Sequence, residues 1–295
     1  MSVLVFGAAG WLGGLVQQEV RARGLEALAA ESRGDEYEAA FAEVARVRPR
    51  LVFSALGRTH GSEAGVQYGT IDYLELPGKL PANLRDNLQA PLVLAAACAR
   101  LRVPFASLAT GCIFSGGKFD EEARPNFTGS SYSAVKGVTD QLLRVLFADS
   151  ALWFRIRMPL THAPHPRSFL SKILAYERIC SVPNSMSVLD GPDGLLGLFV
   201  DMALAGYTGC YNGCNPGVLS HNEVLEMYRD VVDPSFTWRN FTLEEQALVL
   251  RAARSNNELC SEKLSAAAAE LGRPLVPLRA AVLSVLRSLP RKPAM

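Results

Sequence analysis

The stretch that decides the fold class is Val3-Leu4-Val5-Phe6-Gly7-Ala8-Ala9-Gly10-Trp11-Leu12-Gly13-Gly14. Its four apolar residues are typical of a buried strand, and the glycines that follow have the spacing G-x-x-G-x-x-G before a helical pattern. Gly7 permits a tight turn, Gly10 lets the backbone approach a pyrophosphate, and Gly13 lets the helix pack closely on the strand. The free N–H groups of the helix then face the phosphates. Rather than a plain glycine-rich turn, we predict a dinucleotide-binding loop that includes Trp11 and Leu12.

The rest of the N-terminal half alternates short apolar runs with helix-like stretches. Strands are predicted at 3–6, 25–30, 50–56, 104–109 and 153–158, and helices at 11–23, 37–47, 87–101 and 132–148. Such alternation predicts an α/β protein with a Rossmann-type doubly wound parallel sheet. Residues 57–81 interrupt the rhythm with five glycines and two prolines. We predict a long active-site loop there.

After residue 160 the pattern loosens. Helices are predicted at 169–178, 222–231, 243–253, 261–271 and 275–289, separated by proline- and asparagine-containing turns. We therefore expect an NADP(H)-binding Rossmann domain over residues 1–160. Residues 161–295 would form a small mixed substrate-binding cap, interleaved with the last elements of the Rossmann domain.

Composition excludes several classes of protein. Hydrophobic residues make up 49% of the 295 residues, which is enough for a packed core. A net charge of +1 argues against a nucleic-acid-binding protein. No apolar run reaches the roughly 18 residues needed to span a bilayer, and the N-terminus does not have the pattern of a signal peptide. We expect a cytoplasmic protein with six reduced cysteines and no metal site, because Cys210 and Cys214 lack a second pair of ligands.

The residues after the second predicted strand bear on which dinucleotide binds. Glu31 could hold a ribose hydroxyl and favour NADH, whereas Ser32 and Arg33 could bind a 2′-phosphate, which an arginine fork matches well. We expect NADPH, with NADH open as the alternative in which Arg33 is only a loop charge. Further cofactor-binding candidates lie at the end of the third strand: Ser54, Ala55 and Gly57.

The segment Tyr132-Ser-Ala-Val-Lys136 contains the motif Y-x-x-x-K. On a helix this spacing places both side chains on one face, where the ammonium of Lys136 would lower the pKa of Tyr132. Thr110, at the end of a predicted strand, would complete a set that orients a carbonyl and protonates its oxygen. The alternative is a helix on which Tyr132 packs and Lys136 is solvated.

Seven blocks carry a resemblance to a known family. They are Ala109–Phe114, Arg124–Phe127, Arg155–Pro159, Val182–Met186, Asn215–Gly217 with Ser220–Glu223, Asn240–Gln246 and Arg254–Glu258. With these blocks the sequence resembles the extended short-chain dehydrogenases that act on nucleotide sugars. The greatest similarity is to the bifunctional UDP-4-keto-6-deoxy-glucose 3,5-epimerase/4-reductases of rhamnose synthesis, and dTDP-4-dehydrorhamnose reductases are more distant. The blocks run in order from the glycine loop to residue 264, which is most of the chain.

The resemblance implies the roles of individual residues. Thr110, Tyr132 and Lys136 would form the reductase site, at which hydride from the nicotinamide reaches C4 of a keto sugar and Tyr132 supplies the proton. The residues expected to contact the UDP- or dTDP-4-keto-6-deoxy-hexose are Asp72, Tyr73, Cys112, Asn184, Ser185, Met186, Asn215 and Arg254. Arg254 would face the diphosphate, or would be a surface arginine. Asn87 would contact the cofactor, or would cap a helix. A homodimer is expected only by analogy with related folds.

Epimerisation at C3 and C5 needs a base and an acid on opposite faces of the sugar. The resemblance implies a lysine, present here as Lys172 in Phe169-Leu-Ser-Lys-Ile173, and a cysteine, at whose aligned position Leu74 stands. Because leucine cannot transfer a proton, one of the neighbours Asp72, Tyr73, Glu75 or His60 substitutes, or epimerisation is weak or lost. Lys172 itself could be a phosphate-binding or surface lysine. The alternatives are a reductase that follows a separate epimerase, and a non-catalytic dinucleotide-binding subunit.

Overall fold

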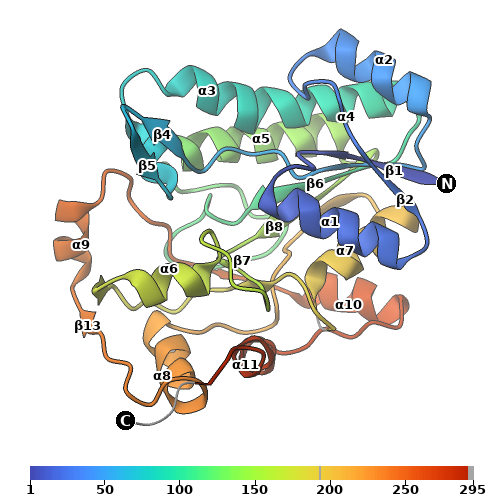
Figure 1. The fold of residues 1–295 in the computed structure, drawn as a ribbon. Helices are drawn as coiled ribbons and strands as arrows, with labels where there is room; N and C mark the ends of the chain where they lie inside the picture. Colours follow the sequence, from blue (N-terminus) through green and yellow to red (C-terminus); the bar gives the residue numbers. More distant parts are fainter. Residues whose placement is uncertain (193, 292–295) are drawn as a thin grey trace.

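A six-stranded parallel sheet forms the centre of the computed structural model, which describes residues 1–192 and 194–291 (Figure 1). The strands are β1 (Ser2–Phe6), β2 (Glu26–Ala29), β3 (Leu51–Ser54), β6 (Phe105–Thr110), β8 (Ala151–Ile156) and β12 (Gly209–Tyr211). They lie in the order β12-β8-β6-β3-β1-β2. The strand order reverses at β1, so a crevice forms at the carboxyl ends of β1 and β3. The predicted doubly wound α/β fold is confirmed.

Helices cover both faces of the sheet. On one face lie α1 (Trp11–Ala22), α7 (Leu195–Leu204) and α10 (Glu262–Glu270), and on the other lie α2 (Tyr37–Val47), α4 (Ala90–Leu101) and α5 (Ser131–Phe147). Successive residues of β1 serve the two cores in turn: Val3 and Val5 pack with the first group, Leu4 and Phe6 with the second. Burial on both faces explains why the strands read as continuous apolar runs.

Two elements that pack in or on the central sheet are not predicted by the sequence pattern. Helix α7 is apolar almost all round, because it packs against both α1 and the sheet, and so it lacks helical periodicity. Strand β12 has three residues only. The helix expected to begin at Asn87 begins earlier, with α3 (Leu80–Leu84), and continues through a π-helical turn (Arg85–Gln89) into α4.

The expected loop at 57–81 contains regular structure. Strands β4 (Gly61–Glu63) and β5 (Val66–Tyr68) pair as an antiparallel hairpin, and a 3₁₀ helix, η1 (Ile71–Glu75), follows. Ala64 and Gly65 both have positive φ angles at the tip, which suits the tight turn of a hairpin. The prediction of an irregular loop was therefore wrong for this part of the segment.

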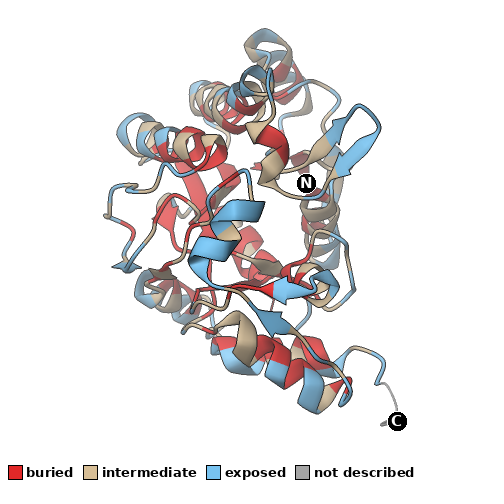
Figure 2. Ribbon diagram, turned by 90° about the vertical axis from the view of Figure 1, so that its left-hand side faces the viewer, coloured by how far each residue is buried: buried red, intermediate tan, exposed pale blue. Residues whose placement is uncertain are grey.

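The second half of the chain builds a separate core below the sheet. It contains α6 (Phe169–Ala175), α8 (His221–Val231) and α11 (Leu278–Arg287). Two short parallel pairs belong to it: β9 (Pro159–Leu160) with β11 (Ser187–Val188), and β10 (Arg178–Ile179) with β13 (Arg239–Asn240). A third pair, β7 (Lys118–Phe119) with β14 (Glu258–Leu259), joins the first half of the chain to the second and packs in a smaller cluster of its own. Helix α9 (Leu243–Val249) buries none of its residues (Figure 2). Several of these helices are shorter than predicted, since α6 ends at Ala175 and α11 starts after Pro277.

The part of the chain that the structure describes contains neither a membrane-spanning helix nor a cluster of metal ligands. None of its helices has the length and apolar character needed to cross a membrane. Within the same residues, no three His, Cys, Asp or Glu side chains gather in a way that could hold a metal ion.

Candidate active site

The glycine loop connects β1 to α1 at the carboxyl edge of the sheet. Gly7 has a φ of 79°, and the N–H of Gly10 donates to the carbonyl of Gly7 over 2.9 Å. A Cβ on Gly13 would lie 2.0 Å from that carbonyl oxygen, so only glycine allows α1 to start this close to the strand. No side chain caps the helix at Gly10. The first N–H groups of α1 are thus available to a phosphate.

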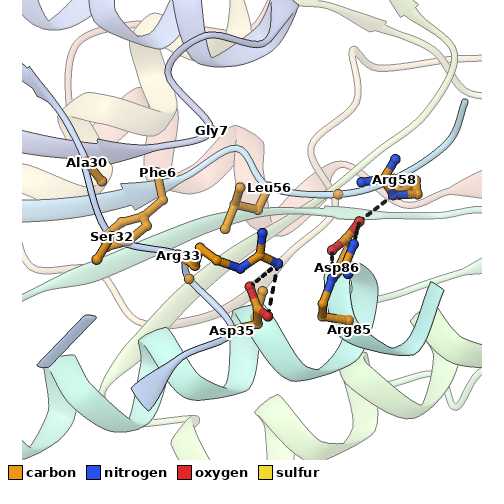
Figure 3. Close-up of a pocket in the computed structure, with 13 residues that line it drawn as sticks. Phe6, Gly7, Ala30, Ser32, Arg33, Asp35, Leu56, Arg58, Arg85 and Asp86 are labelled. Atoms are coloured by element: carbon orange, nitrogen blue, oxygen red, sulfur yellow. Dashed lines mark hydrogen bonds and ion pairs between the residues drawn. The ribbon is translucent and has the colours of Figure 1, made fainter. Parts of the chain in front are cut away.

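A pocket of about 270 Å³ lies beside this loop, at the carboxyl ends of β1, β2 and β3 (Figure 3). Its lining includes Gly7, Ser32, Arg33, Gly57 and Arg58. The pocket therefore brings three of the predicted cofactor segments together: the glycine loop, the segment after β2 and the segment after β3. Its position at the point where the strand order reverses is the usual binding site in open α/β sheets.

Glu43 organises the segment after β2. Its buried carboxylate accepts the backbone N–H groups of Glu31 and Ser32 over 2.8 Å each, and the Ser32 hydroxyl also donates to it. Burial alone would raise the pKa of Glu43, but these hydrogen bonds outweigh it and lower the pKa. The Ser32 hydroxyl is therefore already engaged, whereas Glu31 pairs with Arg46 at the surface.

Arg33 is the remaining candidate of that segment for a 2′-phosphate. Its guanidinium lines the pocket and pairs with Asp35 at 2.9 Å and Glu36 at 3.3 Å, as Figure 3 shows for Asp35. About half of the side chain is exposed (52%). Because the guanidinium and Glu36 are exposed, the guanidinium can exchange its partners for a phosphate.

Asn87 holds the segment after β3. Its Oδ1 accepts the N–H of Arg58 over 3.0 Å, and its Nδ2 donates to the carbonyl of Arg58 and to Asn83, each over 2.9 Å. Asn87 lies inside the π-helical turn and not at a helix start, so the capping alternative is wrong. Ser54 is buried at the end of β3, with Ala55 and Gly57 directly after it. Asn87 thus shapes one wall of the pocket.

Thr110, Tyr132 and Lys136 are all buried beside the carboxyl end of β6. Thr110 is the last residue of β6. Ser130 caps helix α5: its hydroxyl accepts the N–H of Ser133 over 3.1 Å. Within the helix, Tyr132 and Lys136 then lie one turn apart. Both side chains are less than a tenth exposed. The alternative in which Lys136 is solvated does not hold.

The ionisation of this pair differs from the expectation. Burial raises the pKa of Tyr132 well above its usual value, Cys112 raises it further, and the hydrogen bond with Thr110 opposes them. Burial lowers the pKa of Lys136 to about 8, while Asp140 acts to raise it. The predicted lowering of the Tyr132 pKa by Lys136 is wrong for this structure, because desolvation dominates. Tyr132 is therefore protonated at neutral pH, which is the form that donates a proton.

Cys112 is a second candidate for the proton-transfer group that the resemblance implies at the position of Leu74. It packs with Tyr132 and Leu74 in one cluster, and its charge would act on both Tyr132 and Lys172. Arg157 Nη1 approaches its Sγ at 3.9 Å. Burial lowers the pKa of Lys172, and the nearby Arg254 and Arg167 lower it further. The sequence feature that could have indicated a catalytic role for Cys112 is its position two residues after Thr110, at the same strand end.

Asp72 and Arg254 form an ion pair beside the cluster that contains Tyr132 and Cys112. Asp72 follows the β4–β5 hairpin, accepts the N–H groups of Arg251 and Ala252, and forms an ion pair with Arg254. Tyr73, next to Asp72, is buried in the cluster that contains Tyr132. The Asp72 side chain thus joins the first half of the chain to the segment that precedes β14.

Four of the residues predicted to contact the substrate are buried, and three of them form side-chain hydrogen bonds with other segments of the protein. Asn184 accepts from Arg157 and Asn257 and donates to Asn256, and Met186 is fully buried. Ser185 Oγ accepts the N–H of Leu259, and Asn215 bonds to Val188 and Val276. These contacts join the short strand pairs beneath the cleft.

The fold and these side chains define an extended short-chain dehydrogenase. No family model matches the chain. It is 41% identical, with a TM-score of 0.91, to the crystal structure of the L780 UDP-rhamnose synthase from Acanthamoeba polyphaga mimivirus, over 98% of this chain and 99% of that one. It is also 41% identical to the bifunctional dTDP-4-dehydrorhamnose 3,5-epimerase/reductase of Arabidopsis thaliana, over 91% of this chain and 88% of the relative.

The chain belongs to the family of these epimerase/reductases. A more distant structure shows the fold alone: dTDP-4-dehydrorhamnose reductase from Bacillus anthracis, in complex with NADP, has a TM-score of 0.74 at 17% identity, over 97% of this chain and 98% of that one.

Proposed function

We propose that the protein reduces the C4 ketone of a UDP- or dTDP-4-keto-6-deoxy-hexose with NADPH and inverts C3 and C5, giving a nucleotide-linked L-rhamnose. The observation that carries the proposal is the buried set of Thr110, Tyr132 and Lys136 beside Cys112 and Lys172, in a chain of this family. UDP is the favoured nucleotide, since the L780 relative is a UDP-rhamnose synthase.

The residues of the crevice fit a nicotinamide dinucleotide. The close approach of α1 at Gly13 and the uncapped N-terminus at Gly10 leave backbone donors for a pyrophosphate. The pocket at Ser32 and Arg33 would take the adenosine end, and Asn87 would keep its wall in place. When bound, the cofactor supplies the hydride. Arg33 favours NADPH over NADH, because its guanidinium can bind a 2′-phosphate.

Tyr132 is the proton donor of the reduction. Its raised pKa keeps the phenol protonated, and Thr110 beside it is the second donor to the ketone oxygen. Lys136 would hold the ribose of the nicotinamide and, while protonated, stabilise the phenolate left after transfer. A Tyr132→Phe variant should bind NADPH normally and oxidise it on UDP-4-keto-6-deoxyglucose at less than a hundredth of the normal rate. Retained turnover would contradict this role.

Cys112 and Lys172 are the pair we propose for epimerisation. The C3 and C5 protons are acidic because they lie next to the ketone, and the same Thr110 and Tyr132 would stabilise the enolate. The thiolate of Cys112 would accept a proton from one face, and the ammonium of Lys172 would return one to the other. The loss of a cysteine at Leu74 then does not remove the activity, since Cys112 lies in the same cluster.

Arg254 would bind the diphosphate of the nucleotide sugar, and Asp72 would keep its guanidinium in position. The buried residues Asn184, Ser185, Met186 and Asn215 would support the sugar-binding wall through their bonds to neighbouring segments. A protein that binds NADPH but turns over no keto sugar would support the alternative of a non-catalytic subunit.

A further inference from the structure

One segment of the second half reaches back to the cofactor loop. Residues 161–168, here called the cap loop, connect β9 to α6. The imidazole of His165 in this loop stacks on the indole of Trp11, with ring centroids 4.5 Å apart and ring planes only 4° apart. Trp11 is the first residue of α1, directly after the glycine loop. The cap loop is therefore attached at the helix end where a pyrophosphate would bind.

Arg167 is held next to this stack. Nη1 of Arg167 lies 3.2 Å from Nε2 and 3.4 Å from Nδ1 of His60. The backbone N–H of Arg167 donates to Nδ1 of His165 over 3.1 Å. His60 belongs to the segment after β3, which also borders the cofactor pocket. Arg167 thus joins two segments that border the cofactor loop and pocket, through its guanidinium at His60 and its backbone at His165.

The charges that act on the two histidines beside Arg167 are all cationic. Burial and the cations Arg167, Arg58 and Lys172 lower the pKa of His60, and burial, Arg167 and Lys172 lower that of His165. In residues 1–192 and 194–291 Arg167 forms no ion pair, whereas Arg33, Arg58 and Arg254 each have a carboxylate partner. A partly buried guanidinium among other cations lacks the anion that such a group needs.

We propose that Arg167 binds the pyrophosphate of the nicotinamide dinucleotide from the cap side, opposite the N–H groups of α1, with His60 and His165 as positioning residues. The inference rests on the proposed function, because it assumes that cofactor. The stack on Trp11 favours the cofactor over the diphosphate of the sugar nucleotide, since Trp11 adjoins the glycine loop, whereas Arg254, the residue proposed for that diphosphate, is paired with Asp72. The cap loop would then close on the cofactor as well as on the substrate.

The test compares Arg167→Met and Arg167→Lys with the wild-type protein in calorimetric titrations of three ligands: NADPH, adenosine 2′-monophosphate and UDP. Adenosine 2′-monophosphate would occupy the adenosine pocket but lacks both phosphates of the pyrophosphate. We expect Arg167→Met to weaken NADPH binding about ten- to a hundredfold, which is the range for a lost charge-assisted pair. The NADPH affinity of Arg167→Lys should lie between those of the wild type and Arg167→Met, because lysine keeps the charge but lacks the forked guanidinium. The other two affinities should not change.

The control is Arg229→Met, which removes an exposed arginine from α8 and should leave all three affinities unchanged. Unchanged NADPH binding in Arg167→Met would overturn the inference, and a loss of UDP binding instead would assign Arg167 to the sugar nucleotide. Weakened adenosine 2′-monophosphate binding would show that the variant disturbs the adenosine pocket, which also contradicts a direct contact with the pyrophosphate. If the wild-type protein does not bind NADPH, the proposed function itself fails.

Discussion

Asp72 and Arg254 form an ion pair between two segments 182 residues apart in the chain. Asp72 lies in η1, after the β4–β5 hairpin, and Arg254 precedes β14. Burial acts to raise the pKa of Asp72, but hydrogen bonds from Arg254, Thr70 and Ala252 outweigh it, so the pKa lies below its usual value. The pair is therefore ionised above the ordinary pKa of an aspartate, and its contribution to stability is lost as the pH falls through the lowered pKa of Asp72.

Arg254→Met should raise the KM for the nucleotide sugar at least tenfold, because the diphosphate loses a charge-assisted partner. NADPH affinity should not change. Asp72→Asn is the matched variant: its carbonyl oxygen can still accept the N–H groups of Arg251 and Ala252, so it should raise the KM less. Steady-state kinetics check both, and an Arg254→Met variant with a normal KM would contradict the assignment.

Two adjacent glycines give a test of the cofactor loop. Gly13→Ala places a methyl 2.0 Å from the Gly7 carbonyl, so α1 must shift; we expect loss of NADPH binding and about 1–3 kcal/mol less stability. A Cβ on Gly14 meets nothing within 4 Å. Gly14→Ala should bind NADPH normally and gain up to about 1 kcal/mol of stability. Urea unfolding and calorimetry measure both, and equal behaviour of the two variants would argue against the steric account.

The pKa of about 8 at Lys136 predicts a pH dependence of cofactor binding. Below that pH the ammonium can donate to the ribose hydroxyls of NADPH, and above it the neutral amine is a weaker partner. NADPH affinity should therefore fall as the pH rises through 8. Titrations from pH 6.5 to 9.5 check this on the wild type and on Lys136→Met, which should bind less tightly and without that transition. A transition retained in Lys136→Met would assign it to another group.

Cys112→Ala separates the two reactions. We expect the variant to reduce UDP-4-keto-rhamnose, in which C3 and C5 are already inverted, at close to the normal rate. On UDP-4-keto-6-deoxyglucose it should incorporate at least about a hundredfold less solvent deuterium, because Cys112 is the base in the proposed epimerisation. Leu74→Ala is the control, since it alters the same cluster without removing a proton-transfer group. Normal deuterium exchange in Cys112→Ala would exclude this thiol as the base.

Local patterns predicted the sheet half well. Helix α2 has the predicted bounds, and β1, α1, β6 and α5 lie within two residues of them, because apolar runs and helical periodicity report directly on burial there. The pattern fails at α7, whose apolar residues surround the helix, and at the β4–β5 hairpin, whose strands have only three residues each.

The parts of the site that local patterns could not predict depend on distant contacts. The hydrogen bonds of Glu43 to Ser32, of Asn87 to Arg58 and of Asp72 to Arg254 join segments brought together only by folding. The pKa of Tyr132 depends in the same way on burial, which spacing along a helix does not report. The sequence predicts Cys112 as a substrate contact only, because Leu74 stands at the cysteine position that the resemblance implies, whereas the fold places both residues in one cluster.

The most direct test of the account is to incubate the protein with UDP-4-keto-6-deoxyglucose and NADPH in deuterated water and to analyse the product by mass spectrometry and NMR. We predict that NADPH is consumed and that UDP-rhamnose forms with solvent deuterium at both C3 and C5. Consumption of NADPH without deuterium at these carbons would contradict the epimerase assignment of Cys112 and Lys172. No consumption of NADPH would contradict the proposed function as a whole.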